Sequence, residues 1–136
     1  MVKPTFTFPY QFKFITDGKI LNPLLYLPLK IELGWRNSWF LLDSGADTTM
    51  LPLSMAKRLG LSYDSNKKGK LLGIGDKSLD GYSGSIIIKI GQKELKVRCD
   101  FIDAEDSTLL LGRLDVFDKF NIHFDTTNKK IIFHSV

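Results

Sequence analysis

The chain has 136 residues, of which 43% are hydrophobic and 25% are charged, and its formal net charge is +4. This length and composition predict one folded domain over residues 1–136 and exclude a disordered, collagen-like or coiled-coil chain. The lone cysteine, Cys99, cannot form an intrachain disulfide, and so small a basic excess does not by itself indicate nucleic-acid binding.

Targeting and membrane segments are not visible in the sequence. The N-terminal residues contain no apolar run of signal-peptide length, and no stretch approaches the roughly 18 apolar residues that a membrane helix needs. A single thiol also suits a reducing compartment. We therefore expect a cytoplasmic protein that does not bind membranes.

The N-terminal third is predicted to be β-structure. Aromatic and polar residues alternate over residues 6–14, which predicts an extra N-terminal strand within residues 1–20. Pro9 cannot donate to a ladder, so this strand should lie at a sheet edge. Alternation returns in part over residues 25–33, and the apolar run 39–42 is typical of a strand buried on both faces.

A helix is predicted next, over residues 52–59. Pro52 suits the first helical position, and Gly60 suits the position just after the helix end. The polar residues 64–70 follow, with three lysines, and predict a solvated loop. A phosphate-binding patch is the weaker alternative for that segment.

Short strands separated by turns account for the rest of the chain. A hairpin tip is expected at 71–76, a second short helix at 113–120 and a C-terminal hairpin at 121–136; strands are expected at 86–90, 95–102, 109–111, 120–124 and 130–133. The pattern predicts an all-β domain with a closed or nearly closed sheet and one or two short helices.

An acidic residue follows the buried apolar run directly, in the sequence Leu41-Leu42-Asp43-Ser44-Gly45-Ala46-Asp47. Burial penalises a charged carboxylate, so an acid at this position indicates a functional role. Ser44 can bond backbone groups and hold a tight loop, and Gly45 lets another chain approach closely. Taken alone, these residues also fit an Asx turn that ends the strand.

This segment resembles the catalytic motif of the retropepsin-like aspartic proteases, in which apolar residues precede Asp-Ser/Thr-Gly-Ala. Two further family elements follow in the family's order. They are a glycine-rich flap, Leu72-Gly73-Ile74-Gly75, and a Gly-Arg pair after an apolar strand, Leu109-Leu110-Leu111-Gly112-Arg113-Leu114. The resemblance covers residues 24–124 and implies a closed β-barrel of the acid-protease type.

The resemblance also implies a function. Each retropepsin chain supplies one catalytic aspartate, so the site would need two copies of Asp43 in a homodimer. Such a pair would act as an aspartic endopeptidase on polypeptide substrates, by general acid–base activation of water, with no metal and no other cofactor.

Further roles follow from the same resemblance. Ser44, Gly45 and Ala46 would support the catalytic loop, and Asp47 would pair with Arg113. Substrate would contact a larger set, namely Gly45, Asp47, Met50, Gly73, Ile74, Gly75, Thr108 and Leu110. For Met50, Thr108 and Leu110, plain core packing is an equally good interpretation.

Other functions are less consistent with the sequence. Leu42 and Ala46 stand where a serine nucleophile elbow needs glycines. His123 and His134 have no cysteine at ligand spacing, so we expect no zinc site. Binding of single-stranded nucleic acid would leave the Asp43 segment unexplained, and we expect no such partner. The main alternative is a catalytically weak or inactive peptide-binding module with the same fold.

Overall fold

The computed structural model describes residues 2–72, 78–104 and 108–136. Within these ranges it contains one helix, α1 (Leu53–Leu59), and twelve strands: β1 (Thr5–Pro9), β2 (Gln11–Ile15), β3 (Gly18–Asn22), β4 (Leu24–Ile31), β5 (Gly34–Leu42), β6 (Thr49–Pro52), β7 (Tyr63–Leu72), β8 (Ser78–Ile90), β9 (Lys93–Ile102), β10 (Leu110–Leu111), β11 (Phe120–Asp125) and β12 (Lys130–Ser135). No helix in the described ranges is long and apolar enough to cross a bilayer.

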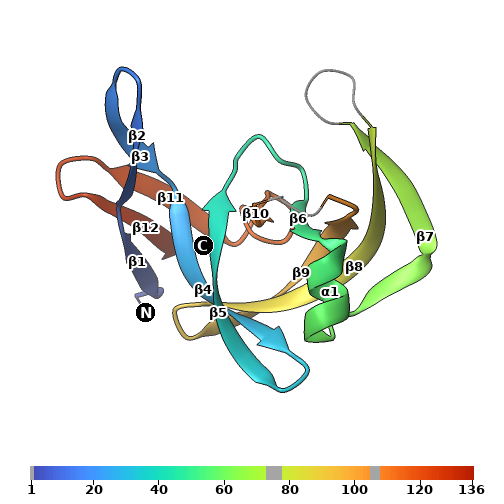
Figure 1. Ribbon diagram of the computed structural model, residues 1–136. Coiled ribbons are helices and arrows are strands. Elements are labelled where there is room, and N and C mark those ends of the chain that lie inside the picture. The colour runs from blue at the N-terminus through green and yellow to red at the C-terminus, as the bar shows by residue number, and fades with distance from the viewer. Residues whose placement is uncertain (1, 73–77, 105–107) are drawn as a thin grey trace.

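Six of the strands form a closed barrel. They neighbour one another in the order β4-β5-β10-β6-β9-β8, and β8 returns to β4 where Leu29 lies opposite Ile88. Strand β7 pairs with β8 outside this ring and lies at the right-hand edge of the molecule (Figure 1). The expectation of a closed all-β barrel is therefore confirmed.

The barrel interior is apolar because its strands alternate. Leu25, Leu27 and Leu29 of β4 are buried, whereas Tyr26 between them and Lys30 after them are exposed. Strand β9 repeats the pattern, with Leu95, Val97, Cys99 and Phe101 buried. Each strand thus has one face in the core and one face in solvent, as expected for a small barrel whose interior is filled by side chains.

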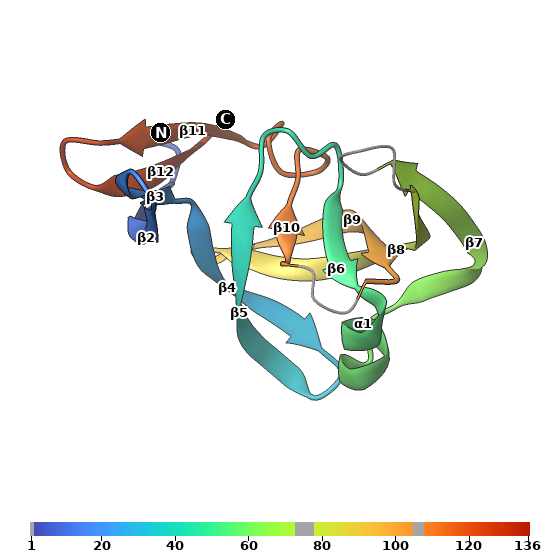
Figure 2. The same cartoon turned by 45° about the horizontal axis from the view of Figure 1, so that its top comes forward.

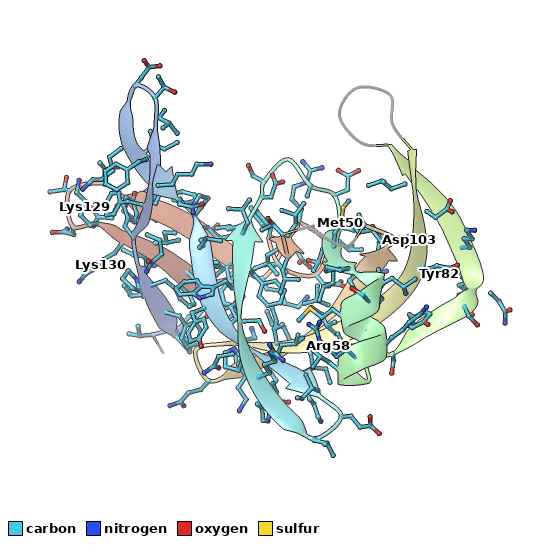
Figure 3. All side chains as sticks on the ribbon, viewed as in Figure 1. Met50, Arg58, Tyr82, Asp103, Lys129 and Lys130 are labelled. Carbon is cyan, nitrogen blue, oxygen red and sulfur yellow. The ribbon has the colours of Figure 1, made fainter. Side chains whose placement is uncertain are left out.

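A second, three-stranded sheet lies beside the barrel in the order β1-β12-β11, and β2 and β3 form a separate hairpin (Figures 1 and 2). The predicted single strand over residues 6–14 is wrong: it breaks at Tyr10 into β1 and β2. The Tyr10 N–H donates to the Lys129 carbonyl in the β11–β12 turn, 3.0 Å away, which redirects the chain. Figure 3 shows Lys129 and Lys130 at that turn.

The first predicted helix is confirmed except at Pro52, which ends β6 with an extended backbone and is not helical, and the second predicted helix is absent from the described residues. Helix α1 follows Pro52 and ends at Gly60, whose φ of +69° is left-handed. Residues 113–119 instead form consecutive turns. The reason is Asp115, whose φ of +67° no α-helix can contain.

The predicted loop over residues 64–70 is also wrong, because these residues belong to β7. Strand β7 bulges between Tyr63 and Lys68 and then pairs regularly with β8. An ion pair of 3.2 Å between Lys68 and Asp80 joins the two strands. Lys67 and Lys68 are exposed residues of this edge strand and do not mark an irregular loop.

Candidate active site

Asp43 lies directly after β5, at the start of a loop of residues 43–48 that leads to β6. We call this segment the acid loop; it is the teal loop at the top of the barrel in Figure 1. The Asp43 N–H donates to the Leu111 carbonyl of β10 at 3.0 Å. One carboxylate oxygen, Oδ1, accepts the Gly45 N–H at 2.9 Å. The half-buried acid is thus held by its own loop and by a neighbouring strand.

Ser44, Gly45 and Ala46 complete the tight turn of the acid loop. The Ala46 N–H donates to the Asp43 carbonyl at 3.2 Å. A Cβ at Gly45 would lie 3.2 Å from Asp43 Oδ1, closer than ordinary contact, so glycine leaves the carboxylate room. Ala46 is buried, while Ser44 and Gly45 are exposed. The exposed residues of the acid loop are therefore Ser44, Gly45 and Asp47.

The acid loop is supported from behind by residues 112–119, which we call the supporting turn. The N–H groups of Arg113 and Leu114 donate to the carbonyls of Ala46 and Asp47, each at 2.9 Å. The Gly112 N–H donates to Thr49 Oγ1 at 3.0 Å, in the interior. These bonds join the Gly-Arg sequence after β10 to the acid loop, although the two segments are far apart in the chain.

Asp47 and Arg113 form an ion pair, in which Arg113 Nη2 donates to Asp47 Oδ1. Their side chains are 85% and 52% exposed, so both charges keep much of their hydration. An exposed pair of this kind contributes about 0–1 kcal/mol to stability. The pair therefore joins the acid loop to the supporting turn and adds little to the stability of the fold.

The acid loop has two supports on β9 that the sequence pattern did not reveal. Thr48 Oγ1 donates to Asp100 Oδ2 at 2.7 Å. Arg98 donates three hydrogen bonds of 2.9 to 3.0 Å to the carboxylate of Asp115 in the supporting turn. These bonds hold the pKa of Asp115 at about 2, below its usual value of 3.8. The only sequence signal was the alternation of β9, which places Arg98 and Asp100 on one outward face.

The structure describes some of the expected substrate-pocket residues but not all of them. Met50 lies opposite Leu110 in the antiparallel β6–β10 pair, and both are half-buried. Figure 3 shows Met50 on β6, just below the acid loop. Thr108 is exposed and precedes β10. The expected flap residues 73–75 lie outside the described residues.

A groove of about 750 Å³ adjoins the outer side of the acid loop. Thr48, Asp100, Arg98 and Leu114 line one part of it, and Ser62 and further residues of β7, β8 and β9 line the rest. The described pocket candidates Met50, Thr108 and Leu110 do not line this groove.

The described residues contain no group of three or more histidine, cysteine or acidic side chains that could hold a metal. His123 and His134 stack with ring centroids 6.2 Å apart on β11 and β12.

Cys99 lies in the core, and burial raises the pKa of its thiol to about 12. A thiol in this state is a poor nucleophile. The described chemistry at the acid loop is therefore that of carboxylates and backbone amides.

A closed six-stranded barrel that presents Asp-Ser-Gly-Ala after one of its strands has the retropepsin-like fold. Comparison with known proteins agrees with this class. The sequence model of the aspartyl protease family matches residues 27–113, which is more than half of the chain. The chain belongs to this family.

Solved structures with a similar fold come from several sources. EIAV protease complexed with the inhibitor HBY-793 is 25% identical, with a TM-score of 0.54 over 68% of this chain and 82% of that one. A retropepsin-like aspartic protease from Rickettsia conorii is 17% identical, with a TM-score of 0.58 over 99% of this chain and 95% of that one. The retroviral protease-like domain of Ddi1 from Leishmania major is 18% identical, with a TM-score of 0.55 over 83% and 94%.

A curated relative is the UBA domain-containing protein Mud1 of Schizosaccharomyces pombe. It is 27% identical over 118 residues, which are 85% of this chain. The chain spans only about a third of that protein's length, since the match covers 35% of it.

Proposed function

We propose that the protein is an aspartic endopeptidase whose site forms when two chains bring their Asp43 carboxylates together. The observation that carries the proposal is the position of Asp43 in a member of the aspartyl protease family. It follows a barrel strand, in a loop held by backbone bonds from β10 and the supporting turn. The sequence contains one Asp-Ser-Gly, so a single chain has only half of the acid pair.

The proposed reaction is general acid–base hydrolysis. Two carboxylates in contact share one proton, because both cannot be ionised without strong repulsion. The ionised Asp43 takes a proton from a water molecule as that water attacks the peptide carbonyl. The protonated Asp43 of the other copy donates its proton to the carbonyl oxygen. The first Asp43 then gives the proton that it took from water to the amide nitrogen, and the other Asp43 takes a proton from a hydroxyl of the hydrated carbonyl. The peptide C–N bond breaks, the amine and the carboxylic acid leave, and the pair again holds one proton without any covalent intermediate.

The remaining expected residues take roles around this pair. Ser44 bonds across the dimer axis, and the Gly45 carbonyl accepts a substrate backbone N–H. Asp47 meets the substrate backbone while Arg113 holds its carboxylate. Met50 and Leu110 form adjoining parts of a side-chain pocket. The register of β6 against β10 supports this last assignment, because it places the two side chains together near the acid loop.

Cleavage of a peptide library tests the proposal. Wild-type protein should cut peptides at defined sites, and Asp43→Asn should not cut them, although it folds and assembles as the wild type does. Asp17→Asn, which removes a like charge from the β2–β3 turn, is the matched control and should retain full activity. Equal cleavage by Asp43→Asn would show that the acid is not catalytic.

Mixing the two proteins tests whether the site is shared. If each site needs Asp43 from both chains, an equal mixture that exchanges subunits should retain about a quarter of the wild-type activity per site. Independent active chains would retain about half. The mixture thus separates a shared site from a monomeric enzyme.

A peptide-binding module without strong catalysis is the second candidate. It is supported by the match to part of a UBA domain-containing protein, whose name describes no protease. Binding of library peptides with equal affinity by wild type and Asp43→Asn, without cleavage by either, would favour it.

A further inference from the structure

Arg98 and Asp115 form an ion pair that is much better defined than the pair of Asp47 and Arg113. We call the Arg98–Asp115 pair the clamp. The Arg98 backbone N–H and Nε–H both donate to Asp115 Oδ2, at 2.9 and 3.0 Å, and Nη2 donates to Oδ1 at 3.0 Å. The Asp115 side chain is only 17% exposed. A planar guanidinium that binds both oxygens of a carboxylate fixes the direction as well as the distance of its partner.

Asp115 also has an unusual backbone conformation, with φ at +67°. Non-glycine residues rarely adopt this region, and it persists where surrounding contacts impose it. The bonds from Arg98 are such contacts. The conformation of Asp115 sets the course of the supporting turn, whose Arg113 and Leu114 N–H groups hold the acid-loop carbonyls at 2.9 Å.

Strand β9 provides a rigid base for this support. Its inward side chains, including Val97 and Phe101, are fully buried in the barrel core. Two residues beyond Arg98 on the outward face, Asp100 accepts a 2.7 Å hydrogen bond from Thr48 of the acid loop. Strand β9 therefore holds the loop directly at Thr48 and indirectly through Asp115.

We infer that Arg98 and Asp115 are positioning residues, which fix the acid loop through the supporting turn and thereby set the placement of Asp43. The inference concerns the geometry of the loop, and its effect on catalysis rests on the proposed function. Neither side chain touches Asp43, so neither is a catalytic residue.

Amide hydrogen exchange tests the geometric part without any need for activity. In Asp115→Asn and in Arg98→Gln, the amides of Arg113 and Leu114 should exchange at least about ten-fold faster, because their bonds to the acid loop open more often. Amides in the β8–β9 ladder should keep their wild-type rates. Asp118→Asn, which removes a like charge from the same turn, should leave all of these rates unchanged.

Steady-state kinetics on the same variants test the catalytic part. In Asp115→Asn and Arg98→Gln, kcat should fall at least about ten-fold while KM and the dimer fraction change little. Arg98→Lys keeps the charge but loses the fork, so its kcat should be intermediate. Asp118→Asn should have wild-type kcat.

Several results would overturn the inference. Unchanged exchange at Arg113 and Leu114 in both variants would remove its geometric basis. Faster exchange with an unchanged kcat would show that the clamp does not position Asp43. Equal changes in exchange and kcat in Asp118→Asn would show that the loss of any negative charge in the supporting turn has this effect. The clamp would then have no specific role. If even wild-type protein cleaves no peptide, the proposed function fails, and the exchange rates alone still decide whether the clamp holds the acid loop.

Discussion

Gly112 directly follows β10 and packs against the backbone at the end of the acid loop, so its replacement by alanine should be severely destabilising. An added Cβ would lie 2.4 Å from both the carbonyl carbon and the oxygen of Thr48 and 2.9 Å from the Thr49 nitrogen. All three are backbone atoms, so relief requires the strand and the loop to separate. Separation would also stretch the 3.0 Å bond from the Gly112 N–H to Thr49 Oγ1.

Overpacking of this kind costs about 1–3 kcal/mol, and the rigid backbone at this site places Gly112→Ala at about 3 kcal/mol or more. Each kcal/mol lowers the melting temperature by roughly 2–8 °C in domains of comparable size, so a fall of roughly 10 °C is expected. Thermal unfolding followed by circular dichroism measures it. The matched control is Gly69→Ala in β7, where a Cβ meets nothing within 4 Å. A Gly112→Ala protein that melts within about 2 °C of this control would refute the steric reasoning.

Three further predictions concern charge and reactivity. Because Arg98 lowers the folded pKa of Asp115 from 3.8 to about 2, wild type should be more stable than Asp115→Asn by a constant amount above about pH 5. That difference should shrink as the pH falls toward 2, which urea titrations at several pH values would measure; a difference independent of pH would contradict the assigned pKa. Arg113→Ala should change the free energy of unfolding by less than about 1 kcal/mol, because its ion pair is exposed, yet should reduce peptide cleavage, so a large loss of stability would count against this account. Cys99 should resist a thiol reagent at pH 8 in native protein and react after denaturation, and rapid native labelling would contradict its burial.

The local parts of the site could be predicted from the sequence because each depends on neighbouring residues. An apolar run followed by Asp43, Ser44 and Gly45 specifies a strand that ends in a tight acidic turn. Pro52 and Gly60 likewise mark the ends of α1. The Gly-Arg sequence packs behind the acid loop through a long-range contact. That contact was predicted only from the resemblance to known proteases.

The supports on β9 could not be predicted in this way. Thr48 and Asp100 are 52 residues apart, so their hydrogen bond depends on the parallel register of β6 and β9. The helical spacing of apolar residues after Arg113 favoured a helix, but the tertiary bonds from Arg98 hold Asp115 in a left-handed conformation that prevents one. In β7, the lysines favoured a loop because lysine is common in any solvent-exposed segment. Its frequency therefore does not distinguish a loop from an edge strand.

The barrel closes between β4 and β8 through one registered backbone pair, Leu29 with Ile88, whereas β8 and β9 pair along ten registered positions. Both seam side chains are fully buried, so apolar contact does at this seam much of what the backbone ladder does between β8 and β9. Contact between such side chains is not directional and tolerates sliding. The seam between β4 and β8 therefore depends on the shape of two side chains, whereas the junction between β8 and β9 depends on backbone bonds that almost any sequence could form. A substitution that removes apolar volume at Leu29 or Ile88 would loosen the barrel at this seam and leave the β8–β9 ladder in place.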